Sequence, residues 1–225
     1  MKSISFNKTT GVTAIFSALL FFISIYGMLA YLQGDLRHVS SFIQNMANQS
    51  TKMLLYGWPG LFATLLMIPL FRAMHKRNHR NNELSGLLLI ISYIGISFIL
   101  VGYMFHLAFT YFHAPIYQTM EASQQLAFDA VFQTNIGIQD MFWLTGDLLA
   151  FTGISGIVLL HWKNRSTPRW MILWVVITGL TAAIGSFSFL PEFKSNMILG
   201  LMFMAGFGVY AVWQIVIGIS LLRKE

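Results

Sequence analysis

Two aspartates inside a long apolar run are the residues of this sequence best suited to chemistry. Asp147 falls near the middle of the run 137–161, and Asp140 precedes it by seven residues. Residues seven apart share one face of a helix, so both carboxyl groups point the same way. A carboxylate at the centre of a bilayer costs about 2.5–3.5 kcal/mol on insertion scales. A proton, a hydrogen-bonding partner, a bound cation or a water-filled cavity must therefore offset Asp147.

The preceding apolar run, 85–110, offers a matching face with a histidine and a tyrosine. Seven residues recur along it at heptad spacing and include two glycines and two histidines: Ser92, Gly95, Ile99, Gly102, His106, Phe109 and His113, with Tyr103 beside them. Small residues mark places where membrane helices approach closely, so this face should meet other helices and not lipid. Counting 1.5 Å per residue places His106 and Asp140 at similar depth. We predict a polar, outward-opening cavity lined by Asp147, Asp140, His106 and Tyr103. The alternative is that Asp147 only fixes the register of packed helices.

The composition explains which elements must hold these residues. The chain of 225 residues is 56% hydrophobic and only 10% charged, whereas soluble domains carry about 25% charged residues. Such a surface suits a bilayer, and six apolar stretches each reach the ~20 residues that cross its core. They predict an all-α bundle of six transmembrane helices in one membrane domain, 1–225, with spans at about 11–32, 53–72, 85–110, 137–161, 169–190 and 197–222.

The basic residues predict the orientation of the bundle. With both ends in the cytoplasm, the inner segments hold eleven of the fourteen Lys and Arg residues: Lys2, Lys8, Arg72, Lys76, Arg77, Arg80, Lys163, Arg165, Arg169, Arg223 and Lys224. The outer segments hold the other three: Arg37, Lys52 and Lys194. Positive residues are retained on the cytoplasmic side. We therefore expect a multi-pass protein of the cell inner membrane, N-in and C-in.

The longest connection, about 113–136, lies outside on this topology. Its apolar residues fall near one helical face, which predicts an amphipathic helix on the outer interface. An ordinary polar loop is the alternative. The short basic connections place the second and third spans, and the fourth and fifth, as antiparallel neighbours.

Several chemistries lack the residues that they require. The chain contains no cysteine, so thiolate metal sites and a cysteine nucleophile are excluded. Gly153-Ile154-Ser155-Gly156 looks like the nucleophile motif of rhomboid proteases, but the sixth span contains no histidine to serve as its base. Only His106 and His113 share a face in the outer half, which is too few for the roughly three histidines of a zinc hydrolase. A bis-histidine haem needs its two ligands on facing helices at equal depth, and no partner span supplies the second. We expect no catalytic residues, no metal and no cofactor. Nucleic acid is also excluded as a partner, because the basic residues lie between apolar runs.

Two further segments carry a family resemblance. They are Leu66-Met67-Ile68-Pro69-Leu70-Phe71-Arg72, before a basic loop, and Gly206-Phe207-Gly208-Val209-Tyr210-Ala211-Val212-Trp213-Gln214, continuing to Gly218. With the hydropathy profile, they resemble a bacterial family of uncharacterised six-span integral membrane proteins, a domain of unknown function. The resemblance implies no activity and transfers no site residues.

Three functions remain open from the sequence. The first is binding, sensing or transport of a small or lipidic ligand through the predicted cavity, with membrane lipids as surroundings. The second is a non-catalytic membrane partner subunit or scaffold. The third is an intramembrane enzyme, for which the sequence shows no complete catalytic set.

Overall fold

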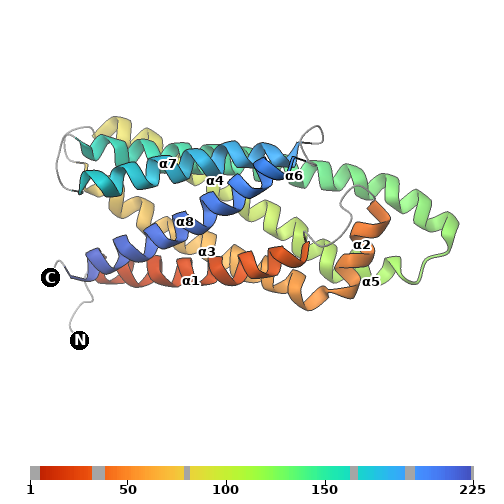
Figure 1. The fold of residues 1–225 in the computed structure, drawn as a ribbon. Coiled ribbons are helices and arrows are strands. Elements are labelled where there is room, and N and C mark those ends of the chain that lie inside the picture. The colour runs from red at the N-terminus through yellow and green to blue at the C-terminus, as the bar shows by residue number, and fades with distance from the viewer. Residues whose placement is uncertain (1–5, 32–38, 79–81, 163–166, 191–195, 224–225) are drawn as a thin grey trace.

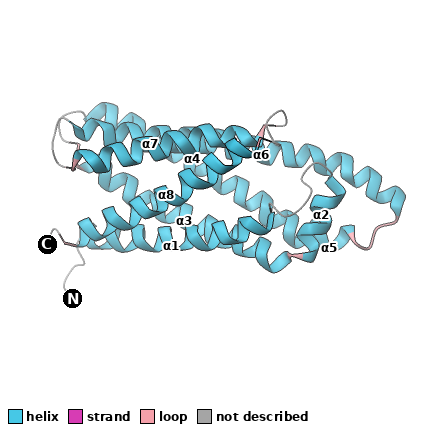
Figure 2. Ribbon diagram, viewed as in Figure 1, coloured by secondary structure: helices cyan, strands magenta, loops and turns pink. Residues whose placement is uncertain are grey.

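The computed structural model describes residues 6–31, 39–78, 82–162, 167–190 and 196–223. Every regular element within these ranges is helical (Figure 2). The long helices are α1 (Phe6–Tyr31), α3 (Ser50–Lys76), α4 (Asn82–Ala108), α6 (Ala122–Leu159), α7 (Arg169–Gly185) and α8 (Met197–Leu222). The short elements are α2 (Val39–Asn48), the π-helical turn η1 (Phe109–His113), α5 (Ala114–Tyr117), and the 3-10 turns η2 (Leu160–Trp162) and η3 (Ser186–Phe189).

Six of these helices are long and apolar enough to cross a membrane. The all-α fold and the six spans predicted from the sequence are confirmed, and the chain is a multi-pass membrane protein. The start of α1 and the end of α8 lie at the same end of the bundle (Figure 1), as an even number of crossings requires. Seven of the basic residues that predict the orientation lie outside the described residues: Lys2, Arg37, Arg80, Lys163, Arg165, Lys194 and Lys224.

The six long helices form a closed ring. Each packs against its neighbour in sequence, and α8 returns to pack against α1, so the order around the ring is α1, α3, α4, α6, α7, α8. The predicted antiparallel neighbours, α3 with α4 and α6 with α7, are confirmed. The ring turns one face of every helix inward, and a single core cluster joins residues from all six.

Glycines allow a close approach of α4 and α6. A Cβ added at Gly95 would lie 2.6 Å from the Gly146 carbonyl oxygen, and one at Gly146 would lie 2.9 Å from the Gly95 carbonyl oxygen. The two backbones therefore touch, which only residues without a side chain permit. The heptad face predicted for 85–110 meets α6 here, since Gly102 also packs on Trp143 and Gly153 on Ser92.

The end of the molecule opposite the termini carries a second, smaller core, here called the α2–α5 end (Figure 1). It joins α2, the start of α3, η1, α5 and the first half of α6 through a buried cluster: Phe42, Ile43, Met46, Met53, Phe109, Ala114, Tyr117, Phe132 and Ile136. The predicted segment 113–136 falls here and is mostly helical. Its second part belongs to the 38-residue α6, which begins after a capping box between Glu121 and Gln124 and extends along the bundle axis.

Candidate functional site

Asp147 points into the interior of the ring. The residues one turn before and after it on α6, Trp143 and Phe151, are both buried. The Trp143 ring contacts Tyr103 of α4 at a centroid distance of 4.4 Å, and the Phe151 ring contacts Phe207 of α8 at 5.0 Å. Asp147 therefore sits on the face of α6 that looks towards both α4 and α8.

The Asp147 side chain is unsatisfied by its surroundings. The residue is 0% exposed, and neither carboxyl oxygen has a hydrogen-bond partner among the described residues. The described Lys and Arg side chains are exposed or half-buried near the helix ends, and none is buried in this core. A buried carboxyl group with no donor and no cation nearby is costly when ionised. Register alone does not require such a group, because an apolar residue of similar size would fill the space.

Tyr103 of α4 packs on Trp143, which lies one turn before Asp147 on the same buried face of α6. Tyr103 and Ser24 of α1 line the same small cavity. The end of the Tyr103 ring packs against Gly60 of α3, where a Cβ would have no room. The Ser24 hydroxyl itself donates to the Tyr56 carbonyl oxygen at 2.8 Å. Polar side chains of α1, α3 and α4 therefore gather near the turn of α6 that precedes Asp147.

His106 belongs to the wall behind this group. Its Nε2 lies 3.1 Å from the Met53 carbonyl oxygen. Because a carbonyl oxygen can only accept, Nε2 carries the proton and donates. The ring also meets the Tyr56 ring edge-on at 4.7 Å. His106 therefore joins α4 to α3. The Tyr56 ring lies between His106 and Tyr103, and its centroid is 5.5 Å from that of Tyr103.

Asp140 lies at another level of α6 than Asp147. It is buried, at 9% exposure, on the same face of α6 as Asp147, about 10 Å further along the helix at 1.5 Å per residue. Its neighbour Gln139 donates to the Gly102 carbonyl oxygen at 3.4 Å. The two acids therefore occupy separate layers of the bundle.

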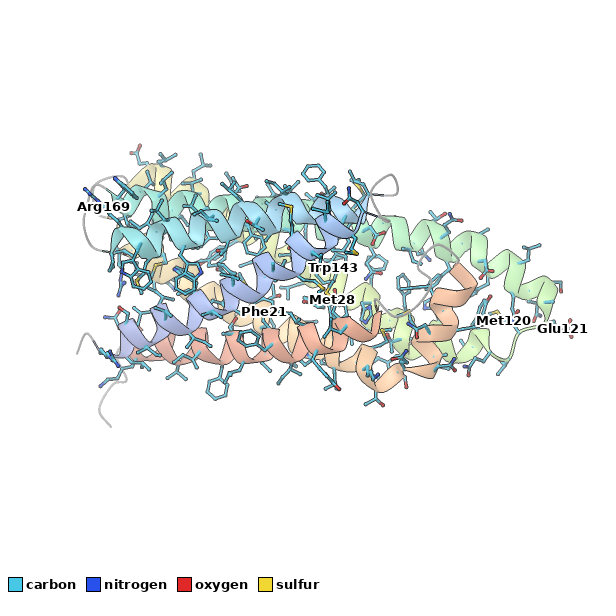
Figure 3. The ribbon with its side chains drawn as sticks, in the orientation of Figure 1. Phe21, Met28, Met120, Glu121, Trp143 and Arg169 are labelled. Carbon is cyan, nitrogen blue, oxygen red and sulfur yellow. The ribbon has the colours of Figure 1, made fainter. Side chains whose placement is uncertain are left out.

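A small cavity lies beside the Tyr103 group, between α1 and α8. Its volume is about 20 Å³, which is room for one water-sized molecule. Ten residues line it: Phe21, Ser24, Ile25 and Met28 of α1, Tyr56 of α3, Tyr103 of α4, Trp143 of α6, and Phe203, Met204 and Phe207 of α8. Figure 3 shows Phe21, Met28 and Trp143 in the space between α1, α8 and α6.

The walls of this cavity differ from those predicted. Of the four predicted site residues, only Tyr103 lines it, and most of the lining is aromatic or aliphatic. The lining residues that carry a hydroxyl group are Ser24, Tyr56 and Tyr103. Asp147, Asp140 and His106 lie outside the lining, and Asp147 follows the lining residue Trp143 by one turn of α6.

The serines of α1 were missed by the sequence reasoning, although a signal exists. Thr10, Ser17 and Ser24 follow one another at intervals of seven residues and are all buried. Ser17 donates to the Ala63 carbonyl oxygen at 2.8 Å and lies 3.4 Å from Oε1 of Gln214. A polar heptad in an otherwise apolar span predicts a face turned towards other helices.

The described residues around Asp147 do not form a set of metal ligands. Within the described residues, His, Asp and Glu nowhere form a group of three that could hold a metal ion. What the site offers is a carboxyl group, a phenol, a serine hydroxyl and several aromatic faces.

The fold and the site together define a class: a multi-pass helical membrane protein whose ring of six spans encloses a carboxyl group beside a small aromatic cavity. The chain belongs to the DUF4386 family, a domain of unknown function, whose model matches residues 15–224. No curated protein and no solved structure matches it. The resemblance noted from the sequence, to an uncharacterised family, is confirmed at this level.

Proposed function

We propose that this membrane protein binds a small or lipidic ligand in the cavity between α1 and α8, as the recognition step of sensing or transport. The observation that carries the proposal is the cavity itself, with aromatic walls, three hydroxyl groups in its lining and an unsatisfied carboxyl group one turn along α6 from Trp143. Ligand sites in proteins combine a mostly apolar lining with a few placed polar groups. The cavity has this composition.

The packing of α8 supports entry from the side. Near the termini, α8 is tied to α1 by Gly218 and Gly11, where an added Cβ on either would lie 2.8 Å from the other carbonyl oxygen. At its other end α8 packs on α7, where a Cβ at Gly206 would lie 2.6 Å from the Ala182 backbone nitrogen. The blue α8 therefore leaves the red α1 and crosses to α7 (Figure 1). The cavity lies where the two helices diverge.

The rim of the cavity can open without unfolding the bundle. Met28 and Met204 lie on the two diverging helices and are half-buried. Methionine side chains are unbranched and adapt to occupants of different shape. A ligand larger than the 20 Å³ cavity can therefore be admitted by rotating these side chains towards lipid.

The N-in, C-in orientation completes the proposal. It places the divergent ends of α1 and α8 in the outer leaflet of a bacterial inner membrane, and the ligand would reach the site laterally from that leaflet. The predicted site residues Asp147, Asp140, His106 and Tyr103 then divide into two that face the ligand region, Tyr103 and Asp147, and two that support it.

Native mass spectrometry of the full chain in mild detergent tests this function. We expect a bound small molecule or lipid on the native protein, which the cavity-filling variants Met28→Trp and Met204→Trp lose. Leu201→Trp is the matched control, because Leu201 lies on α8 near Met204 but is 51% exposed on the outside. Retention of the same adduct by all four proteins would refute a site between α1 and α8.

A further inference from the structure

Asp147 also indicates which class of ligand this cavity accepts, if the proposed binding function holds. Both of its carboxyl oxygens lack a hydrogen-bond donor within the described part of the chain. The surroundings supply no cation either, because Lys and Arg side chains of the described ranges stay near the helix ends. A group that brings its own positive charge would satisfy this carboxylate, whereas an anionic group would be repelled by it.

The cavity walls favour the same charge. Six of the ten lining residues are aromatic: Phe21, Tyr56, Tyr103, Trp143, Phe203 and Phe207. The faces of aromatic rings carry negative electrostatic potential and attract ammonium groups, most strongly where water is excluded. Aromatic faces in front and a carboxylate behind therefore act in the same direction.

Trp143 connects the two features. It lines the cavity and lies one turn before Asp147 on the buried face of α6, so a ligand that enters beside Trp143 meets the part of α6 that carries the carboxyl group. The aliphatic and methionine residues of the lining, Ile25, Met28 and Met204, suit an apolar chain. Among the lining side chains none carries a basic group that would compete with a cationic ligand.

We propose that the ligand is a cationic amphiphile, whose ammonium group pairs with the Asp147 carboxylate while its apolar part lies between α1 and α8. Asp147 is then the specificity-determining residue, and the cavity walls set the shape of the apolar part. The pairing leaves all covalent bonds unchanged.

Three probes share one twelve-carbon alkyl group and differ in the charge of the head group: dodecyltrimethylammonium, dodecanol and dodecanoate. They separate the effect of charge on binding from the effect of the apolar group. Their binding is measured by titration against the full-length protein in phosphatidylcholine nanodiscs, with empty nanodiscs subtracting partition into lipid. We expect the ammonium to bind the native protein at least about tenfold more tightly than the alcohol, as one charged contact supplies. Dodecanoate should bind most weakly.

Asp147→Asn tests the assigned residue with a side chain of the same shape and no charge. It should bind ammonium and alcohol with similar affinity. Glu121→Gln is the control, because Glu121 is exposed at the start of α6, and it should keep the native preference. Asp147→Glu should also keep it.

The possible results separate the two proposals. Equal binding of ammonium and alcohol by the native protein, which needs no variant to fold, would overturn the cationic class and leave the cavity in place. Binding of none of the three probes would remove both the cavity function and this inference. An ammonium preference that survives Asp147→Asn would show that another group sets the specificity.

Discussion

Two contacts between neighbouring helices are built in opposite ways. The contact of α4 with α6 is closed by five glycines along its length: Gly95, Gly102, Gly146, Gly153 and Gly156 all meet the opposite helix. The contact of α1 with α8 is closed by a glycine pair only near the termini, at Gly11 and Gly218. Further along, the Phe21 and Phe207 rings meet at 5.8 Å, and the cavity follows.

The difference shows which parts of the ring are fixed and which can move. Backbones in direct contact allow one arrangement, because any displacement loses close packing along the whole length. Large flexible side chains allow several arrangements of similar energy. The α4–α6 contact therefore holds Asp147 and Tyr103 in place, while the α1–α8 contact admits the ligand.

Gly146→Val should produce the largest effect, because it separates the fixed contact. The added Cβ would lie 2.7 Å from Cγ1 of Ile99 and 2.9 Å from the Gly95 carbonyl oxygen. Overpacking of this kind costs about 3 kcal/mol in free energy of unfolding, measurable by denaturation in mixed micelles. Gly137→Val on the same helix is the control, since a Cβ there meets no atom within 4 Å. Equal losses would show that the α4–α6 contact is not fixed by glycine.

Asp147→Leu should change stability in the opposite direction. Removing a buried polar group that lacks partners, and filling its place with an apolar side chain, stabilises a protein by about 1–3 kcal/mol. The same variant should lose the ligand adduct seen by native mass spectrometry. A fall in the free energy of unfolding would instead show that the carboxyl group is an interhelical contact, which is the structural alternative raised by the sequence.

Much of the fixed contact could be predicted from the sequence. The length and apolarity of the spans determine their number, because the bilayer sets both. The spacing of Gly95, Ile99 and Gly102 places them on one face of a helix, and that face meets α6. Asp147 could be identified because a carboxyl group in an apolar run is rare at any depth.

The contact between α1 and α8 could not be predicted in the same way. It pairs the first span with the last, and no local pattern in either span specifies that pairing. The direction of His106 was also beyond the sequence, because its spacing is compatible with facing either α6 or α3, and its hydrogen bond to the Met53 carbonyl oxygen selects α3. The start of α6 at Ala122 depends on the capping box of Glu121 and not on apolarity.

Two serines of α1 distinguish structural from ligand-facing polar groups. Ser17 and Ser24 each donate to a carbonyl oxygen of α3 at 2.8 Å, but only Ser24 lines the cavity. Ser17→Ala and Ser24→Ala should each lower the free energy of unfolding by about 1 kcal/mol, the net value of one hydrogen bond. Only Ser24→Ala should also alter ligand affinity in the nanodisc titration. A change of affinity in both variants would mean that the whole α1 face, not the cavity, senses the ligand.

Gly208→Ala should give the smallest effect and the most specific information about the movable helix. Gly208 lies on α8 one residue beyond Phe207, and a Cβ there meets no atom within 4 Å. Close packing thus gives no reason for glycine, and alanine in a helix interior is favoured by about 0.5–1 kcal/mol. If bending of α8 opens the cavity, the variant should gain this stability and exchange ligand more slowly, as stopped-flow dissociation of dodecyltrimethylammonium would measure.

Gly200→Ala, also on α8 and also without a neighbour within 4 Å, should gain similar stability with unchanged exchange, because it lies nearer the end that packs on α7. Identical exchange rates for the two variants would place the opening motion in α1 or in the methionine side chains of the rim.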